Sequence, residues 1–570
     1  MLIYKNLTQV PKSLKLQAEF ANGEKASAYI AQLQQLLINK GYIEASVDSV
    51  NTVGDSTFIH LYTGRQYAWG NVSINDSIRR ILDYQKLPFE SGVPMEAVNE
   101  KSWSEQLLEK LATVGYPFAR IQLDSVNINN NQTIDASVNI NLGQLYKIDS
   151  LHIQGSLKVK PKFIYPYLQM KKGMYYNQAI LDNIQQRLNE LPYVEIVMPW
   201  QLELLGSGSI VNIFANQRRS NVFDAIIGFM PANTSEPQEA RSKLLVTGQV
   251  NLEFNNAFGV GENLAINWQQ IQKGTPQLKL HYWQPYLAGT QFGALFDFDL
   301  FKRDSQFVNI AFKIGMPVSF TNNRSVSVFY EQQNTITTNV DTLAVMYNYR
   351  LPDLADITIN KLGLSFNWYN TDYKYNPLKG WIIEVNGAAG IKKVKPNSLI
   401  TSMKNPQNPA FDYATLYDTV TLRSYQVQAT AKVDKYFPLN RHSTVRIANQ
   451  TGMIQSKSYY RNELFMLGGY KTLRGFDEQS IYANFYSIMT AEYRLLTGKN
   501  AYFFGFSDVA ITQYNDTYYK QNYKYISGGI GINVETKNSL INISWALGKR
   551  NDLPFDFRNS KIHIGFKNFF

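Results

Sequence analysis

Phe-Met-Leu-Gly-Gly-Tyr-Lys-Thr-Leu-Arg-Gly-Phe, residues 465–476, is the stretch that decides the fold. The six residues that matter most in it are Gly468, Gly469, Leu473, Arg474, Gly475 and Phe476. Glycine permits backbone conformations that other residues avoid, so this stretch fits neither a strand nor a helix. Because residues 420–570 otherwise alternate as strands do, the insert either forms a surface turn in solvent or folds back among the strands. An arginine that folds inside, here Arg474, needs carboxylate partners.

Two carboxylates follow on what the alternation predicts to be the next two strands. Glu492 lies in Met-Thr-Ala-Glu-Tyr-Arg-Leu-Leu, and Asp508 lies in Phe-Phe-Gly-Phe-Ser-Asp-Val-Ala. A planar guanidinium group favours paired hydrogen bonds with carboxylates. The glycine pair, the arginine and the two acids together favour the folded-back loop over the surface turn, with Glu492 and Asp508 holding Arg474.

This combination resembles the outer-membrane assembly and translocation superfamily, the bacterial surface antigen family of the BamA and TamA type, whose members carry POTRA modules before a β-barrel. Its signature is a Gly-Gly stretch leading to an Arg-Gly-aromatic tip, in a loop that returns into the barrel lumen. The resemblance implies that Arg474 is the tip arginine and that Glu492 and Asp508 are its acidic partners on the barrel wall. Leu473 replaces the commoner valine, and Ala510 stands where the family usually has glycine.

The composition is typical of such a barrel. A chain of 570 residues exceeds what one hydrophobic core serves, so at least two domains are expected. Aromatic residues make up 14% of the chain, yet the mean hydropathy is only -0.28. Barrel strands produce both values, because apolar side chains that face lipid alternate with polar side chains that face the lumen. No run of 18 apolar residues occurs, which argues against membrane-spanning helices.

Charge and the absence of cysteine narrow the chemistry. Residues 1–216 carry 19 Lys and Arg and 19 Asp and Glu, so the whole net charge of +11 lies beyond them. No nucleic-acid-binding module is recognisable, and a basic lumen or basic loops near anionic head groups fit better than nucleic acid. Without cysteine there are no disulfides, thiolate nucleophiles or Cys-type zinc sites, and the five histidines are dispersed. We expect no catalytic residues, no metal and no cofactor.

The first 216 residues contain a repeat. Alternation from Leu14 to Phe20 predicts a strand, and apolar spacing from Lys25 to Lys40 predicts a helix that ends at Gly41. A helix end followed by Gly-Tyr and a strand recurs at 111–119, which indicates a repeat of about 75 residues.

Two further units show the order strand, helix, helix, strand, strand, which is the POTRA order. The predicted elements are a strand through Val72, helices near Asp76–Asp83 and Met95–Leu111, then a strand Ile148–Ile153, helices near Pro161–Gln169 and Asn177–Leu191, and strands reaching Phe214. The first unit shows one helix and is atypical or truncated. The predicted domains are 1–65, 66–143 and 144–216, all POTRA-like, and 217–570, the barrel. A three-stranded sheet leaves an edge that can accept another strand, although such modules could also serve only as spacers.

From about Asn221 the periodicity changes to two. In Asn-Leu-Ala-Ile-Asn-Trp-Gln, residues 263–269, the apolar residues take one face, and about sixteen such segments can be counted. The last strand ends at Phe570, and a terminal aromatic residue resembles the sorting signal of outer-membrane barrels. The predicted fold class is therefore α+β POTRA modules followed by an all-β transmembrane barrel of about sixteen antiparallel strands.

The resemblance implies a function without covalent catalysis. We expect a factor in the bacterial outer membrane, with its POTRA modules in the periplasm, that inserts or translocates unfolded outer-membrane proteins. The resemblance also implies contact with the lipid bilayer and, through the POTRA modules, with a periplasmic or inner-membrane partner. Clients would pass through a lateral seam between the first and last strands, whose predicted residues are Ile226, Gly228, Ile564, Gly565 and Phe570. A dedicated secretion pore of the two-partner type and a passive porin are the alternatives, and no signal peptide can be read from the N-terminus.

Overall fold

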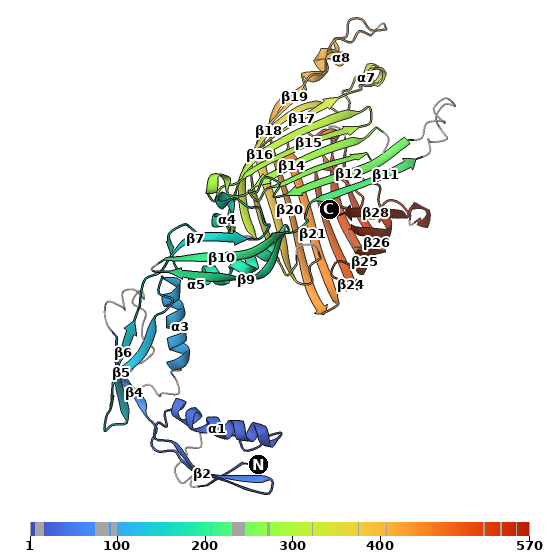
Figure 1. Cartoon of the computed structure of the whole chain (residues 1–570). Helices are drawn as coiled ribbons and strands as arrows, with labels where there is room; N and C mark the ends of the chain where they lie inside the picture. The colour runs from blue at the N-terminus through green and yellow to red at the C-terminus, as the bar shows by residue number, and fades with distance from the viewer. Residues whose placement is uncertain are drawn as a thin grey trace. The chain divides into compact units, whose positions relative to one another are not determined.

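The computed structural model describes the chain except for 1, 6–15, 75–90, 93–99, 207, 231–244, 271–273, 322, 374–375, 406, 517–518, 536–538, 555 and 569–570. It forms two compact units, which are 1–153 with 170–185 and 199–213, and 154–169 with 186–198 and 214–570. Figure 1 shows the elements along the chain, with small sheets early in the sequence and one large sheet from β11 to β28.

The first small sheet has the order β1-β3-β2 and packs against one helix. Its elements are β1 (Leu2–Lys5), α1 (Gly23–Asn39), β2 (Ser46–Val53) and β3 (Ser56–Tyr62). The strand predicted from Leu14 to Phe20 is wrong within the described part of that range, residues 16–20. The backbone N–H of Leu2 donates to the carbonyl of Ala18, so this stretch runs beside β1 without entering the sheet, and β1 takes the predicted place. Gly41, at φ +88°, follows the helix as expected.

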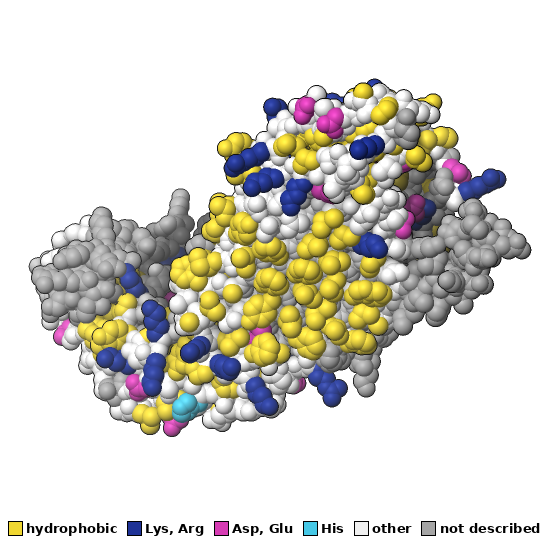
Figure 2. Space-filling model, turned by 90° about the horizontal axis from the view of Figure 1, so that it is seen from above, with side chains coloured by type: hydrophobic (Ala, Val, Ile, Leu, Met, Phe, Trp, Pro, Cys, Tyr) yellow, Lys and Arg dark blue, Asp and Glu magenta, His cyan; other side chains and the backbone are white. Residues whose placement is uncertain are grey.

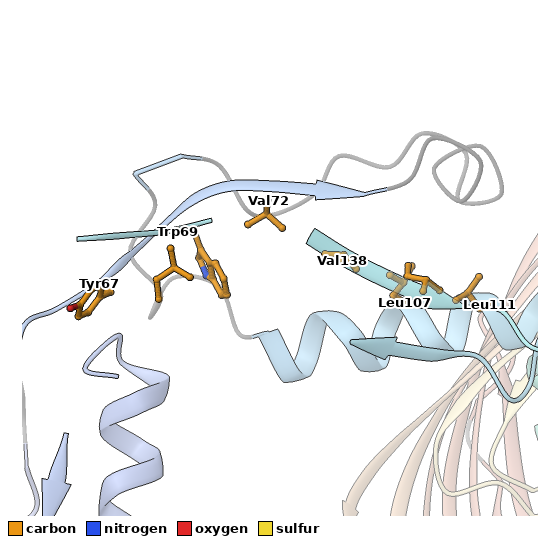
Figure 3. Close-up of a cluster of buried hydrophobic side chains, with 8 residues drawn as sticks. Tyr67, Trp69, Val72, Leu107, Leu111 and Val138 are labelled. Atoms are coloured by element: carbon orange, nitrogen blue, oxygen red, sulfur yellow. The ribbon is translucent and has the colours of Figure 1, made fainter. Parts of the chain in front are cut away.

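The second small sheet has the order β4-β6-β5. Its elements are β4 (Ala68–Ile74), α3 (Glu100–Thr113), β5 (Arg120–Ile128) and β6 (Thr133–Asn141). Trp69 from β4, Leu107 and Leu111 from α3 and Val138 from β6 are buried in one cluster (Figure 3). The helix predicted near 76–83 and the start of the one predicted at 95 lie outside the described residues.

The third small sheet has the order β8-β7-β10-β9. Its elements are β7 (Lys147–Gln154), α4 (Pro161–Tyr167), β8 (Met174–Tyr175), α5 (Gln178–Asp182), α6 (Ile184–Glu190), β9 (Val194–Leu205) and β10 (Gly208–Gln217). The single helix predicted over 177–191 is two short helices. The amide of Asn183 donates to the Ala179 carbonyl at 2.6 Å, a side-chain bond that competes with the helical pattern where the two helices meet. The exact boundaries between the modules stay predictions.

The large sheet has sixteen strands, each antiparallel to the next, which confirms the predicted barrel. They are β11 (Val222–Met230), β12 (Leu245–Asn255), β13 (Asn263–Gln270), β14 (Pro276–Gln284), β15 (Ala294–Arg303), β16 (Phe307–Thr321), β17 (Arg324–Thr337), β18 (Asp356–Thr371), β19 (Gly380–Lys395), β20 (Arg423–Asn440), β21 (Ser443–Ser456), β24 (Phe485–Leu496), β25 (Tyr502–Asn515), β26 (Lys520–Glu535), β27 (Ser539–Arg550) and β28 (Lys561–Asn568). Between them lie α7 (Thr342–Asn348), α8 (Ser398–Thr401), β22 (Phe465–Leu467) and β23 (Ile481–Ala483).

In this sheet polar side chains face inward and apolar side chains face outward, the reverse of the arrangement in a soluble protein. In β18, the Lys361 side chain is 1% exposed, whereas its neighbour Leu362 is 66% exposed. Leu364 and Val328, which lie opposite each other, are also exposed. Figure 2 shows a broad field of hydrophobic side chains with lysine and arginine around its border. The apolar face is therefore the lipid-facing face, and the polar face lines the lumen. No helix among the described residues is long and apolar enough to cross a membrane.

The direction of the strands defines two ends of the barrel. Because β11 follows β10 in the chain, β11, β13, β15, β17, β19 and β21 begin at the end where the chain enters from the modules, here called the module end. The opposite end, the distal end, carries the longer connections 338–355, 396–422 and 457–484. The last of these contains the stretch at 465–476, so the loop starts at the distal end of the barrel.

Candidate functional site: the inserted loop and its ion network

The loop between β21 and β24 forms a short hairpin of its own, and the tip of this hairpin contacts the barrel wall. Strands β22 and β23 pair in antiparallel fashion, with Leu467 opposite Ile481, and bring the two ends of the tip together. Gly468, Gly469 and Gly475 all have φ between +85° and +107°, which other residues rarely adopt. The N–H of Gly469 donates to the Phe476 carbonyl at 3.1 Å. The glycines therefore allow a compact tip that presents Arg474.

Arg474 lies against both predicted carboxylates. Its Nε and Nη2 donate to the two oxygens of Asp508 at 2.9 and 2.8 Å, and its Nη1 donates to Oε2 of Glu492 at 2.6 Å. Its guanidinium carbon lies 3.4 Å from the centre of the Phe506 ring. Asp508 and Glu492 are 0% and 4% exposed, and Thr490 donates to Asp508 at 2.8 Å. A bidentate ion pair between side chains that are so deeply buried fixes the position of the tip closely.

The arginine belongs to a larger network that the sequence did not reveal. Arg494 donates to Oε1 of Glu492 at 2.7 Å, and Arg446 lies 3.9 Å from Oε2 of the same carboxylate. Arg446 also donates to Asp434 at 2.9 Å. With Arg474 and Asp508, the network holds three arginines and three acids, so its formal charge is balanced. It joins β20, β21, β24 and β25 to the loop.

Apolar contacts support the tip. Leu473 is fully buried with Ile488, Ala510 and Tyr525, and the Phe476 ring lies edge-on to Tyr525 at 5.2 Å. Ala510, which departs from the family pattern, contributes its methyl group to this cluster. A Cβ at Gly548 would collide with the Phe476 ring, so β27 must have glycine where the tip passes.

The base of the loop has a separate anchor on β19 and β20, near the distal end of the wall. Lys392 of β19 is fully buried and binds Glu463 of the loop, and its Nζ also donates to the Ser458 carbonyl at 2.9 Å. Gln426 of β20 donates to the other oxygen of Glu463 at 2.9 Å. The Asn462 amide donates to the Ala355 carbonyl at 2.8 Å. Residues 457–464 are therefore tied to the wall near the distal end.

The tip also contacts the last strand. The N–H of Gly475 donates to Nε2 of His563 at 3.2 Å, and Asp477 pairs with Lys561 at 2.7 Å. Asp477 and Lys561 are 61% and 33% exposed, so this ion pair is more accessible to solvent than the pair of Arg474 with Asp508. One loop thus joins β24 and β25 to β28.

The predicted seam residues lie on the first and last strands of the sheet. On β11, Ile226 and Gly228 are opposite Gln249 and Thr247. On β28, Ile564 and Gly565 are opposite Ile543 and Asn542, and Phe570 lies outside the described residues. Some Cα atoms of β11 and β28 lie within 8 Å of one another, but in the part of the chain that the structure describes no hydrogen-bonded ladder joins them.

Some of the missed residues had a signal in the sequence. Arg494 lies two positions after Glu492, so the period of two already places both side chains on one face of a strand. Arg446 lies opposite Glu492 only because of the strand register, which the sequence does not state. No group of three or more potential metal ligands occurs among the described residues.

Comparisons with known proteins agree with this architecture. A model of the Omp85 superfamily domain matches residues 256–564, more than half of the chain. Outer membrane protein assembly factor BamA of Neisseria meningitidis serogroup B is 21% identical over 491 residues, 81% of this chain. The chain spans 57% of the length of that relative.

Solved structures show the same fold. CdiB from Acinetobacter baumannii aligns with a TM-score of 0.53 and 12% identity, covering 96% of this chain and 97% of that one. CdiB from Escherichia coli aligns with a TM-score of 0.52 and 11% identity, covering 97% and 100%.

Proposed function

The chain belongs to the Omp85 superfamily and is an outer-membrane β-barrel with POTRA modules in the periplasm, and from this premise we propose that it inserts other polypeptides into that membrane. The module end of the barrel then faces the periplasm, and the distal end faces the outside. The name of the Neisseria relative, an assembly factor, supports this direction. The work is conformational: the protein offers backbone hydrogen-bonding groups and a path into the bilayer.

The observation that carries the proposal is the junction of β11 and β28. The two strands are near each other without a ladder among the described residues, and they have only nine and eight residues. Strands with free N–H and C=O groups bind other strands by edge addition. A client hairpin that pairs with β28 or β11 would satisfy these groups and would leave sideways into lipid.

The modules offer further edges for capture. β2, β5 and β9 each form one edge of a small sheet, and each carries exposed apolar side chains. β2 has a register shift after Val47, β5 has one after Asp124, and β9 contains Pro199. Such features limit how long a strand each edge can bind, which suits transient capture of an unfolded client. A periplasmic or inner-membrane partner would use the same edges.

The loop would keep the rest of the barrel in one conformation while the seam between β11 and β28 opens. Its tip is fixed on β24 and β25 through Arg474, and its base is fixed on β19 and β20 through Glu463. The lumen therefore contains a fastened segment, which favours a lateral path over a central one. A dedicated secretion pore, the second candidate, would need that segment to leave.

The test locks the seam with cysteines, since the chain has none of its own. Ile226→Cys with Ile564→Cys is oxidised in membranes, and assembly of a barrel client is followed. The control pair, Val328→Cys with Leu364→Cys, bridges directly opposed residues of β17 and β18 away from the seam. We expect the seam link alone to stop assembly while both barrels stay folded. Normal assembly with the seam linked would contradict the lateral path and favour the secretion pore.

A further inference from the structure

Two cations lie on the lipid-facing surface at the module end, each against an aromatic ring. Arg324, the first residue of β17, is opposite Trp368 of β18, and its guanidinium carbon lies 4.8 Å from the centre of a Trp368 ring. Lys435 of β20 is opposite Trp381 of β19. Its Nζ lies 4.2 Å from the Trp381 ring and 5.4 Å from the Phe437 ring.

Strand parity places both side chains on the outside. In β17, Arg324 shares its face with Val328, which is 51% exposed, while Ser327 and Phe329 on the other face are buried. In β20, Lys435 shares its face with Phe437, which is 46% exposed, while the intervening Tyr436 is buried. Both cations therefore point from the wall toward lipid.

The acidic residues of β19 and β20 are on the other face, and Asp372, in the turn between β18 and β19, accepts from the backbone N–H groups of Leu378 and Lys379. Glu384 and Asp434 lie in the lumen, where they bind Lys432 and Arg446. Among the described residues, no carboxylate oxygen lies within 4.0 Å of the Arg324 guanidinium nitrogens or of the Lys435 amine. Neither cation therefore has an ion pair with a described residue. A cation at the edge of the hydrocarbon region needs an anion or water, and the aromatic ring stabilises its charge from one side only. The anionic groups available at this depth of a bilayer are lipid phosphates.

We propose that Arg324 with Trp368, and Lys435 with Trp381 and Phe437, form a binding site for anionic phospholipids of the periplasmic leaflet. The cations are three strands apart, about 14 Å at the usual strand spacing, so each takes its own phosphate. The rings hold the cations at the level of the head groups, which is where aromatic side chains settle at membrane interfaces. The site lies on the wall away from β11 and β28, so it can stay occupied while the seam opens.

The test uses the full chain in nanodiscs of phosphatidylcholine and phosphatidylglycerol. Native mass spectrometry counts the lipids that the released protein keeps. We expect wild type to retain phosphatidylglycerol preferentially, and Arg324→Ala with Lys435→Ala to lower that preference by about fivefold for each cation removed. Lys435→Arg keeps the charge and should keep the lipid. Heat-modifiable migration checks that each barrel is folded.

The matched control is Lys393→Ala with Arg423→Ala. These two cations are opposite each other on β19 and β20 at the distal end, on the same outward face but with no aromatic contact among the described residues. We expect this variant to retain phosphatidylglycerol as wild type does. Equal losses in both double variants would reduce the effect to general surface charge and overturn the proposal, as would wild-type retention in Arg324→Ala with Lys435→Ala. Displacement of the lipid by inorganic phosphate would show a site for the free ion and would also overturn it.

Discussion

The inserted loop meets two parts of the barrel wall in different ways. On β24 and β25 it is held by Arg474, whose guanidinium group makes three hydrogen bonds to Asp508 and Glu492 among side chains that are at most 9% exposed. On β28 it is held by one backbone bond to His563 and by the Asp477–Lys561 pair, which is partly in water. Buried pairs cost several kcal/mol to break, whereas exposed pairs contribute about 0–1 kcal/mol. The same loop thus fixes one wall firmly and the last strand weakly.

The strands in the middle of the sheet are also longer than the strands at its two ends. β18, β19 and β20, on the far side of the sheet from its ends, have 16, 16 and 18 residues, whereas β11 and β28 have nine and eight. Longer strands share more ladder hydrogen bonds with their neighbours, so they separate less easily. β13 and β14 are also short, with eight and nine residues, but each is paired with a neighbour on both sides, whereas at the seam short strands and the weak contacts of the loop coincide. A part of the molecule that has to open is expected to be the part with the lowest local stability.

Arg474→Ala should have the largest effect on this contrast. Within the described part of the chain, Asp508 would keep only Thr490 as a side-chain partner, and a buried, uncompensated carboxylate costs about 3–5 kcal/mol of the free energy of unfolding. Urea unfolding in lipid vesicles measures the loss, and client assembly should fall with it. Arg474→Ala with Asp508→Asn removes the unpaired charge and should recover part of the stability. A single variant with wild-type unfolding and assembly would contradict the role of the network.

Lys392→Met should have the next largest effect, because it releases the base of the loop. Glu463 keeps Gln426 and the N–H of Tyr460, so we expect a loss of about 2–3 kcal/mol. Trypsin added from outside should then cleave after Lys457 or Arg461.

The matched control for this variant is Lys361→Met. Lys361 is equally buried and pairs with Glu331 at 2.8 Å, but both residues belong to wall strands, and Gln428 is on a wall strand as well. This variant should lose stability without exposing the loop to trypsin. Cleavage in both variants, or in neither, would contradict a separate base anchor.

The sequence predicted the barrel well because its signal is local and repeated. A period of two over about ten residues, as in 263–269, is visible without any knowledge of partners, and it recurs often enough to give the strand number. The early strand at 14–20 was predicted from the same pattern, but there the edge of the sheet is taken by β1, a four-residue strand too short to show a period. The split at Asn183 depends on one side-chain bond and left no trace in the apolar spacing.

The site was predictable only where its parts lie near one another in sequence. Arg474 comes 18 and 34 residues before its two acids, and a glycine-rich insert draws attention to it. Lys392 and Glu463 are 71 residues apart and neither lies in a distinctive motif. The same holds for Arg324 and Trp368, which are neighbours only through the register of β17 and β18. Contacts that depend on register need the structure.

The smallest effect on stability, and the sharpest test of the contrast, comes from the contact to β28. Asp477→Asn with His563→Ala removes both bonds between the tip and the last strand, and because the ion pair is partly exposed we expect a loss of about 1 kcal/mol or less. Hydrogen exchange of the backbone should nevertheless rise in Lys561–Asn568 and stay unchanged in β24 and β25, which Arg474 still holds. Asp552→Asn is the control, since it breaks the similarly exposed Arg550–Asp552 pair away from the loop and should leave exchange in β28 unchanged. An equal rise of exchange in β24, β25 and β28 would contradict the contrast, because it would mean that the loop stabilises these three strands together and β28 no less than the others.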